Sequence, residues 1–144
     1  MSEDGPRVIA LVGAREHVLK SRTFNQLCVG FRHFRKISSD RKLRYMRLFE
    51  RRFSRVKEML ELVRIAFSVE EVSNIVKASK PVLIIVDDKL FRAIDYEPRI
   101  PESAPKPKYM NYLVTIADNL ANYFRLILKN NPRKFREELR RFEK

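Results

Sequence analysis

The sequence contains one cysteine, no tryptophan and only three glycines among its 144 residues. A single cysteine excludes an internal disulfide and any zinc site built from several thiolates, which is typical of a chain in the reducing cytoplasm. No glycine precedes a Lys-Ser or Lys-Thr pair, so a glycine-rich phosphate loop is excluded. The longest apolar run, residues 82–86, is far shorter than the ~20 residues that cross a bilayer. We therefore expect a soluble cytoplasmic protein without cofactor or membrane contact.

Residues typical of catalysis are also sparse. His17 and His33 fall on separate predicted helices, with no carboxylate or thiol at the spacing of metal ligands. Cys28 lies on the apolar face of a predicted helix, where a buried and unreactive thiol is expected. These residues predict neither a metal site nor a nucleophile.

Four acidic residues follow the apolar run and leave one catalytic alternative open. They are Asp87, Asp88, Asp95 and Glu97. Carboxylates that converge on one point can hold Mg²⁺ for phosphodiester cleavage, so a metal-dependent nuclease is an alternative. Aspartate is also favoured in turns because it forms local hydrogen bonds, which explains the cluster more simply. We therefore predict that the protein is not an enzyme.

Positive charge is abundant and unevenly distributed. The net charge is +13, and residues 32–64 hold twelve Lys or Arg against four acids while residues 125–144 hold eight against three. Two basic regions around a nearly neutral centre favour binding to a polyanion. The competing interpretation is a thermophile-like surface, whose charges would serve ion-pair networks. That interpretation expects nearer balance between the two signs.

Two helices are predicted before residue 68. Apolar residues spaced as i, i+3, i+4, i+7 and i+10 predict an amphipathic helix over about 22–37. The Ser-Ser-Asp sequence at 38–40 offers an N-cap to a second helix over 41–67. The second helix carries an apolar stripe with spacings of three and four: Met46, Phe49, Phe53, Val56, Leu60, Val63 and Phe67. We expect this stripe to be buried in the chain's own core, although the same spacing leaves a homodimer open.

The opposite face of the second helix is basic. At about 100° per residue, four arginines form a band almost opposite the apolar stripe: Arg44, Arg47, Arg51 and Arg55. We call this set the arginine ridge and predict that it contacts phosphate. A second basic surface is predicted on the last helix: Arg133, Arg136 and Arg140. Tyr45, Tyr109, Tyr112 and Tyr123 are the candidates for base stacking, although Tyr45 is favoured as a packing residue.

The remaining elements complete a mainly helical prediction. Residues 7–13 suit a helix or a short strand, and we favour a helix there. Ser68 and Glu71 match a capping box that begins a helix through residue 78. The β-branched run at 82–86 and the alternating residues after it predict a β-hairpin over 82–96.

The last third of the chain is predicted to be a strap followed by helices. Four prolines between residues 98 and 107 predict an extended strap over 97–108. Helical periodicity returns over 109–144 and is interrupted at Asn130, Asn131 and Pro132. The predicted fold is mainly α, a compact helical bundle with a small inserted β-hairpin, in one domain over residues 1–144.

Together these features predict a non-catalytic protein that grips the phosphate backbone of RNA or single-stranded DNA. Duplex DNA stays open as a partner, and so do a transcriptional or chromatin protein and a protein-interaction adaptor that uses the proline-rich strap. Small basic helical chains often serve as subunits of larger nucleoprotein complexes, of which the small subunits of archaeal CRISPR effectors are one class. This is an analogy of type, because no motif of any family aligns with the sequence.

Overall fold

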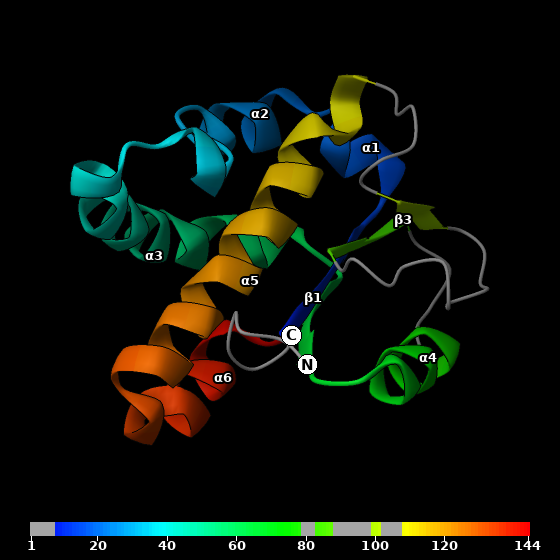
Figure 1. The fold of residues 1–144 in the computed structure, drawn as a ribbon. Helices are drawn as coiled ribbons and strands as arrows, with labels where there is room; N and C mark the ends of the chain where they lie inside the picture. Colours follow the sequence, from blue (N-terminus) through cyan, green and yellow to red (C-terminus); the bar gives the residue numbers. More distant parts are fainter. Residues whose placement is uncertain (1–7, 79–82, 88–98, 102–107) are drawn as a thin grey trace.

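A four-stranded sheet lies at the centre of the structure, a computed structural model that describes residues 8–78, 83–87, 99–101 and 108–144. The strands are β1 (Ile9–Ala14), β2 (Leu62–Ala66), β3 (Leu83–Asp87) and β4 (Arg99–Pro101), in the order β2-β1-β3-β4. β1 pairs antiparallel with both neighbours, and β3 pairs parallel with β4. β1, the first element of the chain, and β3 are therefore the two inner strands of the sheet (Figure 1).

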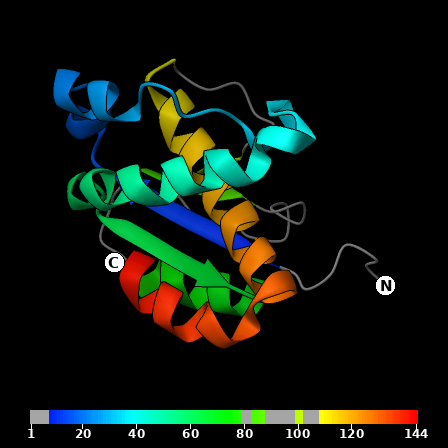
Figure 2. The same cartoon turned by 90° about the vertical axis from the view of Figure 1, so that its left-hand side faces the viewer.

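Helices cover both faces of this sheet. In chain order they are α1 (Glu16–Leu19), α2 (Arg22–Cys28), η1 (Phe34–Lys36), η2 (Ser39–Arg41), α3 (Lys42–Met59), α4 (Val69–Ala78), η4 (Lys108–Met110), α5 (Asn111–Asn130), η5 (Pro132–Lys134) and α6 (Phe135–Phe142). One face packs against α2, α3, α5 and α6, and the other packs against α4. Figure 2 shows α3 and α5 crossing over the sheet on its larger covered face. No helix among these described residues is long and apolar enough to cross a membrane.

The mainly helical prediction is confirmed, because helices hold far more of the described residues than strands do. The β part is larger than the predicted hairpin. The described part of the run at 82–86 does form a strand, β3, but its two neighbours in the sheet are β1 and β4. The predicted second half of the hairpin, 90–96, lies outside the described residues. Most of the predicted strap over 97–108 lies outside them too, and its described part includes the short strand β4.

The helix favoured over residues 7–13 is wrong for the residues that the structure describes there. Ile9–Ala14 is a strand in which all six residues are buried. An amphipathic helix needs a polar face, and this segment has none. A strand covered on both faces is apolar on both, which explains the unbroken run.

The helix predicted over 22–37 is shorter than expected. α2 ends at Cys28, and Gly30 follows with a φ of +98°. This backbone conformation is open to glycine and strained for other residues, so the chain leaves the helix there. The apolar residues beyond it, among them Phe31 and Phe34, reach the same core from a loop and from η1.

The long basic helix also ends earlier than predicted. α3 stops at Met59, and the chain continues into β2. Leu60 and Val63 remain buried in the core with the α3 stripe, while Phe67 is 37% exposed and packs against Phe135. Periodicity could not reveal the end, because Leu60 and Val63 are buried in either conformation.

The predicted caps had mixed outcomes. The side chains at 38–40 make no cap hydrogen bond to α3, which instead continues from η2. The Ser68 cap of α4 is confirmed, since Ser68 Oγ accepts a hydrogen bond from Glu71 N at 3.1 Å. The predicted break near Pro132 is confirmed as well, and η5 separates α5 from α6 there.

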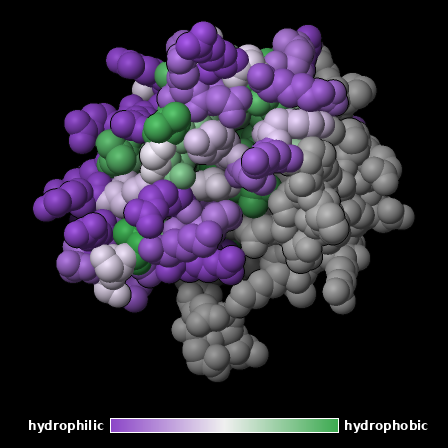
Figure 3. All heavy atoms as spheres, turned by 90° about the horizontal axis from the view of Figure 1, so that it is seen from above, coloured by the Kyte–Doolittle hydropathy of each residue, from purple (hydrophilic) through white to green (hydrophobic). Residues whose placement is uncertain are grey.

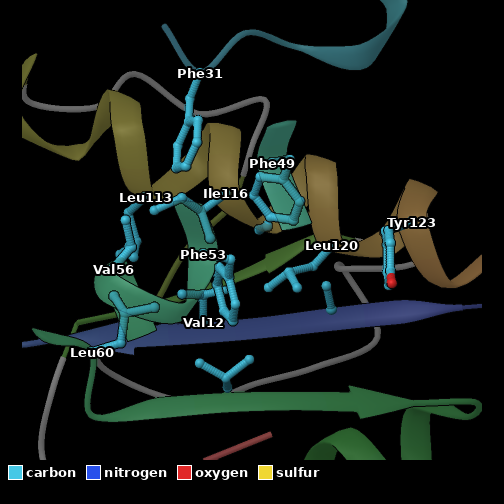
Figure 4. Packing of buried hydrophobic residues seen from close by; sticks show 14 of the residues in the cluster. Val12, Phe31, Phe49, Phe53, Val56, Leu60, Leu113, Ile116, Leu120 and Tyr123 are labelled. Carbon is cyan, nitrogen blue, oxygen red and sulfur yellow. The ribbon is translucent and has the colours of Figure 1, made fainter. Parts of the chain in front are cut away.

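Packed aromatic rings connect α3 with α6 and with the loop after α2. Phe49 lies 5.3 Å from Phe31 and 5.5 Å from Phe53, and Phe142 of α6 stacks on Phe53 at 5.1 Å, measured between ring centroids. Figure 4 shows Phe49, Phe53 and Val56 pointing from α3 into this core with residues of α5. The rings therefore fix α3 by its apolar face, and its other face is left to solvent.

Replacement of Gly30 by alanine tests the turn that ends α2. The positive φ strains any residue with a Cβ, and the new Cβ would lie 3.0 Å from Nη1 of Arg52. We expect Gly30→Ala to lower the free energy of unfolding by about 1–3 kcal/mol, measured by urea denaturation. Gln26→Ala, at an exposed position of α2, is the control and should change it by less than about 0.5 kcal/mol. Equal stability of the two variants would contradict the assigned turn.

Alkaline pH should destabilise the protein through Cys28. Burial raises the pKa of this thiol from 9.0 to about 12. The unfolded chain loses the proton first, so the stability present below pH 9 is lost as pH rises toward 12, at about 1.4 kcal/mol per pH unit. In urea denaturation the wild type should lose stability increasingly steeply, approaching this slope above about pH 9, and Cys28→Ala should show a shallower dependence. The same slope in both proteins would show that the thiol is not buried.

Candidate nucleic-acid interface

The arginine ridge lies on the exposed face of α3, as predicted from the sequence. Tyr45, Met46, Phe49, Phe53 and Val56 are buried on the opposite face. All four ridge arginines are exposed: Arg44, Arg47, Arg51 and Arg55. Within the part of the chain that the structure describes, none of their guanidinium groups forms an ion pair or a hydrogen bond. The ridge therefore carries charge that the fold itself does not neutralise.

Part of the ridge borders a hollow that the sequence did not reveal. The side chains of Leu48, Arg51, Arg52 and Arg55 line a depression of about 320 Å³. Arg52 Nη1 donates a hydrogen bond to the carbonyl oxygen of Val29, which holds this guanidinium at the turn after α2. Three guanidinium groups around one hollow favour an anion there. In the sequence Arg52 resembles the arginines next to it, and only its hydrogen bond to Val29 in the folded chain shows that it is fixed in place.

The second predicted basic surface lies on η5 and α6. Arg133, Arg136 and Arg140 are exposed, and within residues 8–78, 83–87, 99–101 and 108–144 their side chains have no ion-pair partner.

Figure 3 shows one face of the molecule, seen from above, and the described part of this face is predominantly hydrophilic.

Lysine side chains connect α6 and the last residue to α3. Lys57 Nζ of α3 donates to the carbonyl oxygen of Arg141 at 2.6 Å, and Lys144 Nζ donates to the carbonyl oxygens of Lys57 and Glu58 at 3.1 Å. Cations at helix C-termini satisfy free carbonyl groups and oppose the helix dipole. These contacts hold the two basic helices next to each other.

Arg141 of α6 adds an ion pair between α6 and α3. Its Nη2 lies 2.6 Å from Glu50 Oε2 on α3 and 2.6 Å from Glu138 Oε1 on α6. Glu138 is buried and also accepts a hydrogen bond from the hydroxyl of Tyr123 on α5. Burial, followed by this hydrogen bond, raises the pKa of Tyr123 well above its ordinary value. Tyr123 therefore stays protonated and donates at neutral pH.

A cleft of about 420 Å³ lies beside the arginine ridge. It is lined from α3, the end of α5, η5 and α6 by Leu43, Met46, Arg47, Glu50, Tyr123, Leu126, Ile127, Asn130, Asn131, Lys134 and Glu138. Arg47 belongs to the arginine ridge, and Lys134 adjoins Arg133 of the second surface. Of the seven predicted arginines only Arg47 lines the cleft, and the sequence did not predict the cleft itself.

The candidate stacking tyrosines differ in exposure. Tyr45 is buried, as expected of a packing residue, and burial raises its pKa to about 12. Its hydroxyl donates to Asn119 Oδ1 and accepts from the backbone N–H of Arg32 at 2.7 Å. Tyr123 is buried too, whereas Tyr109 and Tyr112 are partly exposed. Tyr45 and Tyr123 are therefore packing residues and not free stacking platforms.

Two polar residues of α5 hold the loop before α3 in place. Asp118 Oδ2 accepts from Phe34 N at 2.8 Å, and Asn119 Nδ2 donates to the carbonyl oxygen of Arg32 at 2.9 Å. The sequence does not single out Asp118 or Asn119, because both continue the helical period and belong to no motif. His33 lies 3.8 Å from Asp118, and His17 is exposed on α1.

The nuclease alternative falls largely outside the described residues. Asp88, Asp95 and Glu97 are not among them, and of Asp87 only the backbone, at the end of β3, is described. The described residues contain no group of three or more His, Cys, Asp or Glu side chains placed to hold a metal ion.

No family model, curated protein or solved structure matches this chain.

Arg141 can be tested against its neighbour Arg140, which is exposed and has no partner among the described side chains. Arg141→Met leaves the Glu138 carboxylate without its cation, and we expect the free energy of unfolding to fall by about 1–3 kcal/mol. Arg140→Met should change it by less than about 0.5 kcal/mol. Thermal or urea denaturation of both variants measures the difference. Indistinguishable stabilities would remove Arg141 from its structural role.

Proposed function

We propose that this protein binds the phosphate backbone of nucleic acid, with RNA or single-stranded DNA as the favoured partner, through the arginine ridge and the basic surface of α6. The binding is non-catalytic, and it suits a small cytoplasmic subunit of a larger nucleoprotein complex. Each guanidinium group is planar and carries N–H donors in a fork that fits two phosphate oxygens.

The observation that carries the proposal is that the seven arginines have no ion-pair partner among the described residues. An ion-pair network, the competing explanation of the charge, would place carboxylates beside these groups. The ion pairs of the described residues involve other cations instead: Arg15, Lys20, Arg64 and Arg141. The arginines of both surfaces are thus left available to an external anion.

The spacing of the ridge adds a second argument. Arg47, Arg51 and Arg55 are four residues apart, and like charges at this spacing destabilise a helix by about 0.2–0.5 kcal/mol per pair. A bound polyanion removes that repulsion. From Arg44 to Arg55 the helix rises about 16 Å, a length over which one strand of a duplex presents about five phosphates.

Charge reversal on the ridge tests the proposal. Fluorescence anisotropy should show that the wild type binds labelled single-stranded RNA or DNA, and that the logarithm of its affinity falls with log salt at a slope of roughly −3.5, or −4.5 on duplex, for about five phosphate contacts. Arg47→Glu/Arg51→Glu should lose at least about tenfold in affinity and show a shallower slope.

The matched control reverses two exposed cations elsewhere. Arg22→Glu/Lys77→Glu, on α2 and α4, makes the same change in net charge and should keep most of the affinity. Equal losses in the two double variants would show that only net charge matters. Absence of binding by the wild type, or binding that does not depend on salt, would overturn the proposed function.

A further inference from the structure

The cleft between α3 and the end of α5 is lined by apolar side chains as well as by charged and amide groups. Met46 of α3 and Leu126 and Ile127 of α5 line it, and so does Leu43, which is 64% exposed. Its volume of about 420 Å³ is in the range of small-molecule pockets, about 300–1,000 Å³. Apolar lining beside a basic surface suits the flat face of a nucleobase better than it suits a phosphate.

The charges of the cleft separate these two parts of a nucleotide. Glu50 and Glu138 line the cleft and share the single guanidinium group of Arg141. Two carboxylates against one guanidinium leave one negative charge, so further negative charge at this wall of the cleft is disfavoured. Arg47 and Lys134 also line it, and neither has an ion-pair partner among the described residues. These two cations can hold phosphates while an uncharged base occupies the apolar part.

Two amides supply polar contacts. Asn130 and Asn131 line the cleft and are exposed, and within the described ranges their side chains make no hydrogen bond. An amide both donates and accepts, as does the ribose 2′-hydroxyl, and this hydroxyl is the group by which a protein distinguishes RNA from DNA.

From this lining we infer that the cleft binds one unstacked nucleotide of single-stranded RNA, while the arginine ridge and the α6 arginines hold the neighbouring phosphates. The inference rests on the proposed function and adds strand selectivity to it. A base within a duplex is paired and stacked on both sides, so it cannot enter the cleft without first leaving the helix.

A cleft variant with unchanged net charge separates this inference from backbone binding. Leu43→Ser/Asn131→Ala removes one apolar and one amide contact at exposed positions, where the fold is tolerant. Anisotropy titrations use a labelled single-stranded RNA, the same RNA annealed to its complement, and single-stranded DNA of the same sequence. We expect the variant to lose about fivefold or more in affinity for the single-stranded RNA and to bind the duplex like the wild type.

Val29→Ser is the control, because Val29 is 58% exposed and does not line the cleft. It should bind all three nucleic acids as the wild type does. If the ridge reversal abolishes binding but the cleft variant binds single-stranded RNA normally, the cleft inference is overturned and the proposed function stands. Binding of single-stranded DNA as tight as that of RNA overturns the assignment to RNA. If the wild type binds none of the three, both proposals fail together.

Discussion

The fold depends on the burial of β1 from both sides. Ala10, Val12 and Ala14 face the core shared by α2, α3, α5 and α6, whereas Ile9 and Leu11 face α4. A strand with no polar side chain on either face is stable only when both faces are covered. The chain meets this requirement by placing helices on each side of the sheet, and the position of α3 follows from it.

The orientation of α3 decides which residues are available to a partner. Its aromatic stripe packs into the core through the rings of Phe31, Phe53 and Phe142, so rotation of the helix about its axis would expose these rings to water. The arginine ridge is consequently held outward on a rigid element. A rigid array loses little conformational entropy when it binds, which favours α3 over a loop as a binding surface.

The C-terminal segment is fixed against α3 by an ion pair and by hydrogen bonds from lysine side chains. Arg141 joins Glu50 to Glu138, and Lys57 and Lys144 satisfy free carbonyl groups at helix ends. The backbone of Lys144 also pairs with that of Val63 at 3.1 and 2.8 Å, which extends the outer edge of β2. These contacts use some of the chain's cations for structure, whereas the ridge arginines and Arg133, Arg136 and Arg140 have no ion-pair partner in the part of the chain that the structure describes.

The sequence by itself determined the helical majority, the Ser68 cap, the break at Pro132 and the exposed arginine ridge, because each depends on residues within a few turns of one another. Tertiary structure decided what local patterns leave ambiguous. Residues 9–14 are a strand because both of their faces are covered. β2 replaces the end of the predicted long helix because it pairs with β1, and the sequence could not show this, since Leu60 and Val63 are buried in either conformation. The cleft between Arg47 and Lys134 joins residues far apart in the chain, so no local spacing encodes it.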